Sequence, residues 1–274
     1  MTRARELVNW LVAAAIAAVI GGPALAAPRI LSTDQCADQY VLALAPRGEI
    51  VGVSKRALND DSNLRALAIG VPERRSDLET ILGARATLVV SYWSPDARLP
   101  ETLGRYGVKV VQIDEANDFP GIRANIRKVA VAIDQGPAGE MLIARMDASL
   151  AQSRGAWGGA RALYLTPYAF TAGKGTLVDA MMSAAGLATA AGPGYGPVSL
   201  ESLVWNPPAA LVLGFFRDLA GGRQHWTIAG AGYLQGLVRR RAVASLPGRL
   251  LGCPARFAAD GTAALAAARG DGAR

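Results

Sequence analysis

Histidine, cysteine and aromatic residues are scarce in this sequence, and each scarcity excludes a class of site. The 274 residues include one His and two Cys, and 6% are aromatic. Structural zinc sites and iron–sulfur clusters need more of these ligands, so we predict no resident metal and no resident cofactor. Two cysteines exclude a disulfide-dense scaffold. The Gly-x-Ser-x-Gly, His-Glu-x-x-His and Cys-x-x-Cys motifs of several enzyme classes are also absent.

Positive charge is in excess but is not concentrated. The chain carries 29 Lys and Arg against 22 Asp and Glu, a formal net charge of +7. Arg239–Arg241 is the only tight basic run, and nucleic-acid binding usually needs a basic patch or stripe. We therefore predict no nucleic-acid partner. The length corresponds to about two globular domains.

The first 26 residues have the pattern of a secretion signal. Arg3 and Arg5 precede an apolar stretch from Leu11 to Ile20, and Ala24-Leu25-Ala26 follows as a small-residue cleavage site. The apolar stretch is shorter than the ~20 residues that span a bilayer, which disfavours the alternative of an uncleaved anchor helix. We expect an exported protein that is cleaved near Ala26.

Export makes the two cysteines interpretable. Cys36 lies near the mature N-terminus and Cys253 near the end of the chain. Thiols tend to pair in oxidising compartments, so we predict one intramolecular disulfide between them. Two buried free thiols are the alternative.

Apolar strand-like runs alternate with helical stretches over most of the mature chain. Such alternation is typical of βαβ units with parallel sheets, so the predicted class is α/β. The predicted strands lie at residues 29–31, 50–53, 87–91, 108–113, 162–165 and 209–213, and the helices at 37–44, 99–106 and 176–185.

The segment from Phe119 to Ser153 is different, because its apolar residues keep helical spacing throughout. We expect a long helix that connects two α/β halves. Pro137 can kink such a helix or open its second section. A pair of ordinary surface helices is the alternative.

Two segments about half the mature chain apart resemble each other. Residues 76–82 contain Leu78-Glu79-Thr80-Ile81-Leu82, residues 199–204 contain Leu200-Glu201-Ser202-Leu203-Val204, and an apolar strand follows each. A serine cap with a glutamate in the first helical turn explains both segments without any function. The spacing also predicts two lobes of similar construction with a ligand cleft between them.

The sequence resembles the class III periplasmic binding proteins of ABC importers. Four stretches carry the resemblance: residues 29–35, the Leu78-Glu79 helix that leads into Leu88–Val90, the turn at 170–177 followed by Ala184-Ala185-Gly186, and Val198–Glu201 before a strand. The resemblance implies two Rossmann-like lobes with central parallel sheets, at 27–118 and 154–274, bridged by one long helix at 119–153. It also implies a monomer that works in the periplasm.

The resemblance further implies that one glutamate on each lobe docks onto arginines of the membrane permease. Glu79 and Glu201 occupy those positions. Two separated carboxylates set the orientation of a partner, and Arg–carboxylate pairs are geometrically selective.

The ligand implied by the resemblance is a metal chelate: first an iron–siderophore, then a corrinoid, with haem less favoured. Its contacts should come from loops at the carboxyl ends of strands. We predict that they are Asp34, Gln35, Tyr92, Trp93, Tyr168, Phe170, Tyr195, Arg217 and Trp226. An exported enzyme on a related fold, such as a chelatase or hydrolase, is the alternative function. His225 as a metal ligand is disfavoured, because a single His is more often a structural residue.

Overall fold

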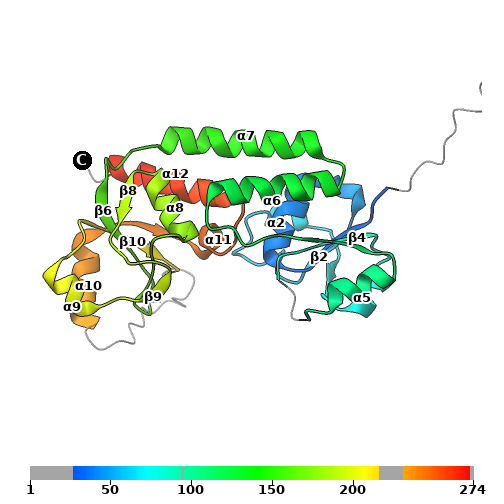
Figure 1. Ribbon diagram of the computed structural model, residues 1–274, viewed down its shortest axis with the longest axis horizontal. Helices are drawn as coiled ribbons and strands as arrows, with labels where there is room; N and C mark the ends of the chain where they lie inside the picture. Colours follow the sequence, from blue (N-terminus) through cyan, green and yellow to red (C-terminus); the bar gives the residue numbers. More distant parts are fainter. Residues whose placement is uncertain (1–26, 94–95, 216–230, 272–274) are drawn as a thin grey trace, which may run out of the picture.

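Two parallel sheets organise the part of the chain that the computed structural model describes, residues 27–93, 96–215 and 231–271. They lie side by side beneath a common layer of helices (Figure 1). The predicted signal peptide and the candidate contacts Arg217 and Trp226 lie outside the described residues. Within these ranges, no helix is both long enough and apolar enough to cross a membrane.

The N-terminal sheet has the strand order β3-β2-β1-β4-β5, and all its pairs are parallel. Its strands are β1 (Ile30–Ser32), β2 (Ile50–Ser54), β3 (Glu73–Arg74), β4 (Leu88–Ser91) and β5 (Lys109–Gln112). Its helices are α2 (Gln35–Leu44), the 3-10 turn η1 (Arg47–Glu49), α3 (Arg65–Ala68), α4 (Leu78–Gly83) and α5 (Leu99–Arg105). The strand order reverses between β1 and β4, which is where open α/β sheets bind ligands.

The C-terminal sheet has the order β11-β10-β6-β8, again fully parallel. Its strands are β6 (Ala160–Leu165), β8 (Leu187–Thr189), β10 (Ala210–Gly214) and β11 (Ala242–Leu246). An antiparallel pair, β7 (Phe170–Ala172) and β9 (Tyr195–Pro197), lies beside it. Its helices are α8 (Leu177–Ala184), α9 (Leu200–Trp205), α10 (Ala231–Arg241), α11 (Gly248–Leu251) and α12 (Phe257–Asp271). The predicted α/β class with two parallel sheets is confirmed.

The middle segment is a helical hairpin, so the prediction of one continuous connecting helix is wrong and the alternative of two helices is right. Helix α6 (Phe119–Ala132) and helix α7 (Gly136–Ser153) run antiparallel. The chain reverses at Asp134, which has a φ of 55°. Pro137 lies in the first turn of α7, where its missing N–H leaves no helical hydrogen bond unmade.

Two ion pairs connect α6 and α7, whose buried apolar residues pack in the same core. Arg123 pairs with Asp147 at 2.6 Å, and Arg127 pairs with Glu140 at 2.7 Å. The hairpin crosses above both sheets in Figure 1, and α12 packs against α7. The bridge between the lobes is therefore a helical layer rather than one rod.

One hydrophobic core joins the two lobes. It contains buried residues of α2, α6, α7, α8 and α12 together with the sheet faces below them. The opposite face of each sheet has a smaller core of its own, covered by α4 and α5 in one lobe and by α9 and α10 in the other. Ile81 and Leu203 are the matching buried residues of α4 and α9.

Helices α4 and α9 are built alike, as the sequence similarity predicts. Each has six residues, a side-chain N-cap and a glutamate in its first turn. Ser199 caps α9 by accepting from the Ser202 N–H at 3.2 Å. In α4 the cap is Asp77, which accepts from the Thr80 N–H at 2.8 Å, so the serine cap expected for both segments is found only in α9. Asp77 occupies the position that matches Ser199 when the two Leu-Glu pairs are aligned.

Candidate ligand-binding site

A cavity of about 770 Å³ lies between the two lobes. Its N-terminal wall consists of loops that follow β1, β2, β3 and β4, the carboxyl ends of parallel strands. The C-terminal lobe contributes Phe215, which follows β10, and residues of the α11 region. The lining is Thr33, Asp34, Gln35, Cys36, Gln39, Ser54, Lys55, Arg56, Asp61, Arg74, Arg75, Ser76, Asp77, Tyr92, Trp93, Phe215, Gly248, Arg249, Gly252 and Cys253. This volume lies in the upper part of the range of pockets that bind small-molecule ligands.

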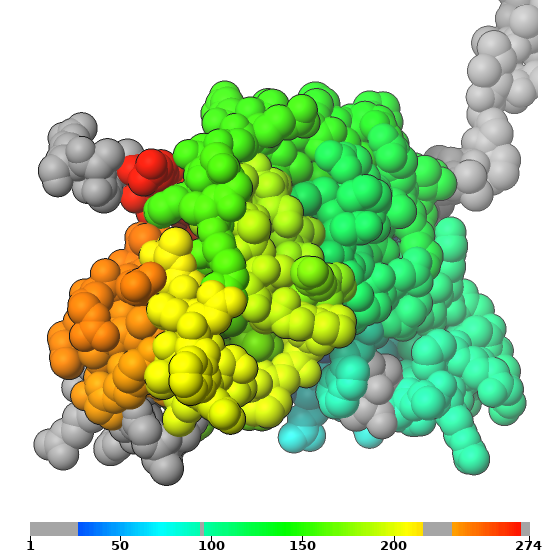
Figure 2. Space-filling view, turned by 60° about the vertical axis from the view of Figure 1, so that its left-hand side comes forward, coloured from blue at the N-terminus to red at the C-terminus, as the bar shows by residue number. Residues whose placement is uncertain are grey.

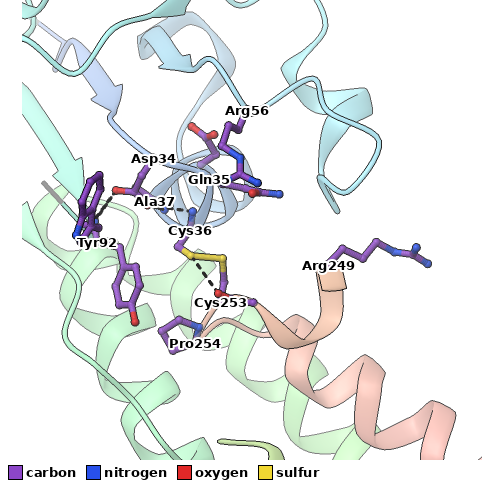
Figure 3. Close-up of a disulfide and its surroundings, with 12 residues drawn as sticks. Asp34, Gln35, Cys36, Ala37, Arg56, Tyr92, Arg249, Cys253 and Pro254 are labelled. Atoms are coloured by element: carbon purple, nitrogen blue, oxygen red, sulfur yellow. Dashed lines mark hydrogen bonds between the residues drawn. A yellow bond between two sulfur atoms is a disulfide. The ribbon is translucent and has the colours of Figure 1, made fainter. Parts of the chain in front are cut away.

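Asp34 holds two loops of the cavity together. One carboxylate oxygen accepts from the N–H groups of Cys36 at 3.0 Å and Ala37 at 2.9 Å, and so caps α2. The other accepts from the N–H groups of Tyr92 at 2.7 Å and Trp93 at 3.2 Å (Figure 3). Each oxygen thus already has at least two donors. Asp34 positions the β1 and β4 loops, and its predicted contact with a ligand stays a prediction.

Asp38 lies one helical turn beyond Asp34 and is almost fully buried. Its carboxylate accepts from the Ser32 hydroxyl, from the Ser54 N–H at 2.9 Å and from the Ser54 hydroxyl at 2.6 Å. Burial raises the pKa of Asp38, and the bonds from Ser32 and Ser54 oppose that rise in part. The residue joins β1, α2 and β2 beneath the cavity. Sequence reasoning missed it, although an Asp within an apolar helix is a usable signal.

Five cations line the cavity, and four of them have no ion pair among the described residues. Arg56 pairs with Asp61 at 3.6 Å. Lys55, Arg74, Arg75 and Arg249 line the cavity without a salt-bridge partner in the described ranges. The sequence prediction missed all five. Lys55 and Arg56 closely follow a predicted strand, and this position was the available signal.

Most carboxylate oxygens of the cavity are engaged by the protein itself, and Asp61 Oδ1 is the exception among the described residues. Asp34 holds four backbone N–H groups, and Asp61 faces Arg56. Asp77 caps α4, and its hydrogen bonds with Thr80 lower its pKa, with smaller effects of Arg75 and Lys55. The cations therefore dominate the charge that the cavity offers to a ligand.

Polar atoms without partners also surround the cavity. Among the described residues, Gln39 Oε1, Asp61 Oδ1 and Arg74 Nε are buried and make no hydrogen bond. All three residues line the cavity, and Gln39 is only 4% exposed. An unsatisfied buried polar atom costs about 1–3 kcal/mol.

Aromatic residues of both lobes meet near the cavity. Tyr92 and Trp93 line it, and the Tyr92 hydroxyl donates to the Glu115 carboxylate. Burial and Glu115 raise the pKa of Tyr92, and Tyr195 of the other lobe lies near enough to add to this rise. The pKa of Tyr195 is raised too, first by burial and then by Glu115. Tyr195 thus lies within electrostatic range of Tyr92 and Glu115, and it is 70% exposed.

The other predicted contacts vary in their placement. Gln35 lines the cavity and donates to the Asp61 carbonyl at 3.2 Å. Tyr168 and Phe170 are half exposed and are not part of the cavity lining. Tyr195 is also not part of that lining. Whether any of these residues contacts a ligand stays a prediction.

The predicted disulfide is present and lies in the cavity wall. Cys36 and Cys253 are joined by an S–S bond of 2.07 Å, and both line the cavity (Figure 3). Next to it, the Tyr40 hydroxyl donates to the Pro254 carbonyl. The disulfide therefore links the two lobes directly at the site.

Glu79 and Glu201 lie outside the cavity lining and are exposed on α4 and α9. Neither carboxylate has a salt-bridge partner among the described residues. The N-cap of α4, Asp77, is itself part of the cavity wall. Each lobe thus presents a carboxylate without a salt-bridge partner in the described ranges.

No protein-family model and no curated protein matches the sequence. Solved structures do match. The periplasmic haem-binding protein BhuT in complex with two haems is 22% identical, with a TM-score of 0.70, over 89% of this chain and 98% of that one. The vitamin B12 binding protein BtuF of Vibrio cholerae is 15% identical, with a TM-score of 0.63, over 90% and 98%.

A third structure is that of an ABC-type Fe3+-hydroxamate transport system from Saccharomonospora viridis. It is 17% identical, with a TM-score of 0.63, over 88% of this chain and 93% of that one. The three structures bear the names of three different ligand classes, so similarity to them does not select a ligand for this chain. They agree on the architecture, and the chain has the two-lobed fold of the class III periplasmic binding proteins.

Proposed function

We propose that the chain is the substrate-binding component of an ABC importer and that its ligand is an anionic metal chelate. It captures the chelate between the lobes, as a monomer in the periplasm, and delivers it to a membrane permease. One observation carries the choice of ligand charge: Lys55, Arg74, Arg75 and Arg249 face the cavity without a salt-bridge partner among the described residues.

The residues around these cations support an iron chelate with carboxylate or catecholate groups. Guanidinium groups bind such oxygens in bidentate geometry, and aromatic faces suit conjugated rings. Tyr92, Trp93 and Phe215 provide those faces. A ferric siderophore with acidic groups fits best, and haem with its two propionates has the same chemistry. Corrinoids and neutral hydroxamates make less use of the cations.

Thermal stabilisation of the purified mature protein tests this proposal. The panel consists of ferric citrate, a ferric tris-catecholate, hemin, a ferric hydroxamate and cyanocobalamin. We expect one of the first three to stabilise the protein, by about 2.7 kcal/mol at a hundredfold excess over its Kd. Stabilisation only by cyanocobalamin or the hydroxamate contradicts the anionic ligand. Turnover of a panel member supports the exported enzyme instead.

Matched arginine variants separate the cavity from general charge. We expect Arg74→Ala and Arg75→Ala each to weaken binding of the anionic chelate at least tenfold. Arg105 is exposed and pairs with Glu101 on α5, outside the cavity lining, so Arg105→Ala should leave the affinity unchanged. Equal losses in all three variants indicate a non-specific effect of net charge.

We also propose that Glu79 and Glu201 dock onto the permease. Both are exposed on matching helices that leave their carboxylates unpaired. The double variant Glu79→Ala/Glu201→Ala should bind the chelate normally and lose uptake in cells. Glu140→Ala, which removes a carboxylate from the helical layer, is the control and should keep uptake.

N-terminal sequencing of the exported protein tests the proposed cleavage of the signal peptide near Ala26.

A further inference from the structure

The two matching helices differ at the position four residues after the glutamate. In α9 this position is Trp205, whereas in α4 it is Gly83. The other aligned positions carry chemically similar residues: Thr80 matches Ser202, and Ile81 matches Leu203. A tryptophan against a glycine is thus the main difference between two helices of the same construction.

Trp205 is exposed to an unusual degree. Its exposed fraction is 82%, and that of the neighbouring Val204 is 57%. Glu201 and Trp205 have i,i+4 spacing, so their side chains share one face of α9. Tryptophan is enriched among the residues that contribute most of the binding energy at protein interfaces. This face combines an indole with an unpaired carboxylate.

The glycine of α4 is not required by the fold. Gly83 is absent from the positive-φ residues, and a Cβ built on it meets no atom within 4 Å. A side chain therefore has room there. The N-terminal lobe presents Glu79 alone, whereas the C-terminal lobe presents Glu201 together with an indole.

Helix α9 is fixed in place, so Trp205 is presented on a rigid support. Leu203 is buried, and its carbonyl accepts from the Tyr233 hydroxyl of α10 at 2.9 Å. Asn206, which follows Trp205, accepts from the Arg161 guanidinium at 2.7 Å. In Figure 2 the yellow segment that contains α9 lies at the surface beside the orange α10. These contacts fix the backbone that carries Trp205, so little backbone entropy is lost when a partner binds there.

We propose that Trp205 is a lobe-specific anchor for the permease, which makes docking of the C-terminal lobe stronger than docking of the N-terminal lobe. The inference rests on the proposed docking of Glu201. A permease arginine that pairs with this carboxylate can also stack on the indole, because a guanidinium binds aromatic faces and carboxylates together. At Glu79 the same arginine finds only the carboxylate.

Uptake by spheroplasts tests the proposal, and the permease need not be identified first. Spheroplasts of the source organism that lack the chromosomal gene receive purified protein. The protein is loaded with a radiolabelled iron chelate, namely ferric citrate, ferric tris-catecholate or hemin, whichever stabilises the wild type most. The protein concentration that gives half-maximal uptake measures docking. Trp205→Ala should raise this concentration at least tenfold, and Trp205→Phe by less than threefold.

Two controls make the result decisive. Tyr106 is a 62% exposed aromatic that follows α5, and Tyr106→Ala should leave half-maximal uptake unchanged. Glu79→Ala should raise the half-maximal concentration less than Glu201→Ala does. If the wild type supports uptake and Trp205→Ala has the same half-maximal concentration, Trp205 is not an anchor, and the proposed function stands. Failure of the wild type to support uptake overturns the proposed function itself.

A lipid surface is the competing occupant. Vesicles of phosphatidylethanolamine and phosphatidylglycerol that contain no membrane protein should bind the wild type and Trp205→Ala equally. Binding that depends on Trp205 in these vesicles assigns the indole to the membrane surface and overturns the proposal.

Discussion

At the scale of single residues, Asp34 connects the capping of a helix to the shape of the site. Its four bonds to backbone N–H groups join the start of α2 to the loop that carries Tyr92 and Trp93. A helix cap alone contributes about 1 kcal/mol, and hydrogen bonds to a charged group contribute about 1.5–3 kcal/mol. We therefore expect Asp34→Ala to lower the free energy of unfolding by about 2–4 kcal/mol and to weaken chelate binding.

A second N-cap aspartate is the control for Asp34. Asp118 caps α6 with one bond, from the Gly121 N–H at 2.8 Å, and does not line the cavity. Asp118→Ala should cost about 1 kcal/mol and leave the chelate affinity unchanged. Urea unfolding and fluorescence titration measure the two effects. Unchanged affinity in Asp34→Ala contradicts its positioning role.

The buried Asp38 gives a pH dependence with a definite sign. Burial raises its pKa above the usual 3.8, so its folded form binds a proton more tightly than its unfolded form. Its contribution to stability is complete below the usual pKa and is lost as pH rises through the raised pKa. Asparagine does not titrate. The stability of the wild type minus that of Asp38→Asn should therefore be level below the usual pKa and fall as pH rises above it.

Asp77 gives the opposite sign and serves as the control. Its bonds with Thr80 lower its pKa, so its contribution is present above the usual pKa and is lost as pH falls. The stability of the wild type minus that of Asp77→Asn should therefore rise with pH up to the usual pKa and stay level above it, where the Asp38 difference falls. Urea unfolding at several pH values measures both differences. Parallel slopes for the two variants contradict the assignment.

The sequence predicted part of the site at this scale, and the reason is strand position. Asp34, Gln35, Tyr92 and Trp93 follow predicted strands and do line the cavity. Arg74 and Arg75 were missed because β3 has only two residues and leaves no apolar run to detect. Gln39 was missed because an unpaired buried atom is visible only once its neighbours are placed.

At the scale of elements, the α6–α7 hairpin shows what periodicity cannot detect. Apolar residues from Ile122 to Leu150 keep helical spacing across the break, so the pattern indicates one helix. The break depends on the three residues between the helices, among them Asp134 with a φ of 55°. Gly136-Pro137 was the available signal, since proline is favoured in the first helical turn. The strands were easier to predict, because buried parallel strands are continuous apolar runs.

Close packing between α6 and α7 predicts that a larger residue at Gly139 destabilises the protein. A Cβ at this position lies 2.6 Å from the Ala130 Cβ, which is closer than atoms in contact can approach. Gly139→Ala should therefore lower the free energy of unfolding by about 1–3 kcal/mol, although alanine is the better helix former. The double variant Gly139→Ala/Ala130→Gly should recover part of the loss, as urea unfolding can measure.

An exposed glycine tests whether the loss comes from the contact. Gly104 lies in α5, and a Cβ there meets nothing within 4 Å. Gly104→Ala should stabilise the protein by about 0.4–1 kcal/mol. Destabilisation of similar size in both alanine variants contradicts the packing explanation.

At the scale of the whole molecule, the lobes are joined in more ways than the sequence predicted. The shared core runs through α2, α6, α7, α8 and α12. The Cys36–Cys253 disulfide and the bond from the Asn63 side chain to the Arg249 carbonyl, at 2.7 Å, cross between the lobes at the cavity. Hinge opening requires this core to separate, and packed cores resist continuous deformation.

These connections predict that the lobes move little when a chelate binds. Small-angle scattering of the oxidised protein should give the same radius of gyration with and without the chelate that stabilises it. The variant Cys36→Ala/Cys253→Ala should lose about 3–5 kcal/mol of stability, because the disulfide closes a loop across 217 positions. Its radius of gyration should still not change on binding, since the shared core remains. If only the double variant becomes more compact when the chelate binds, the disulfide is the main restraint on the lobes. If the wild type also becomes more compact, the lobes close on the ligand despite the shared core.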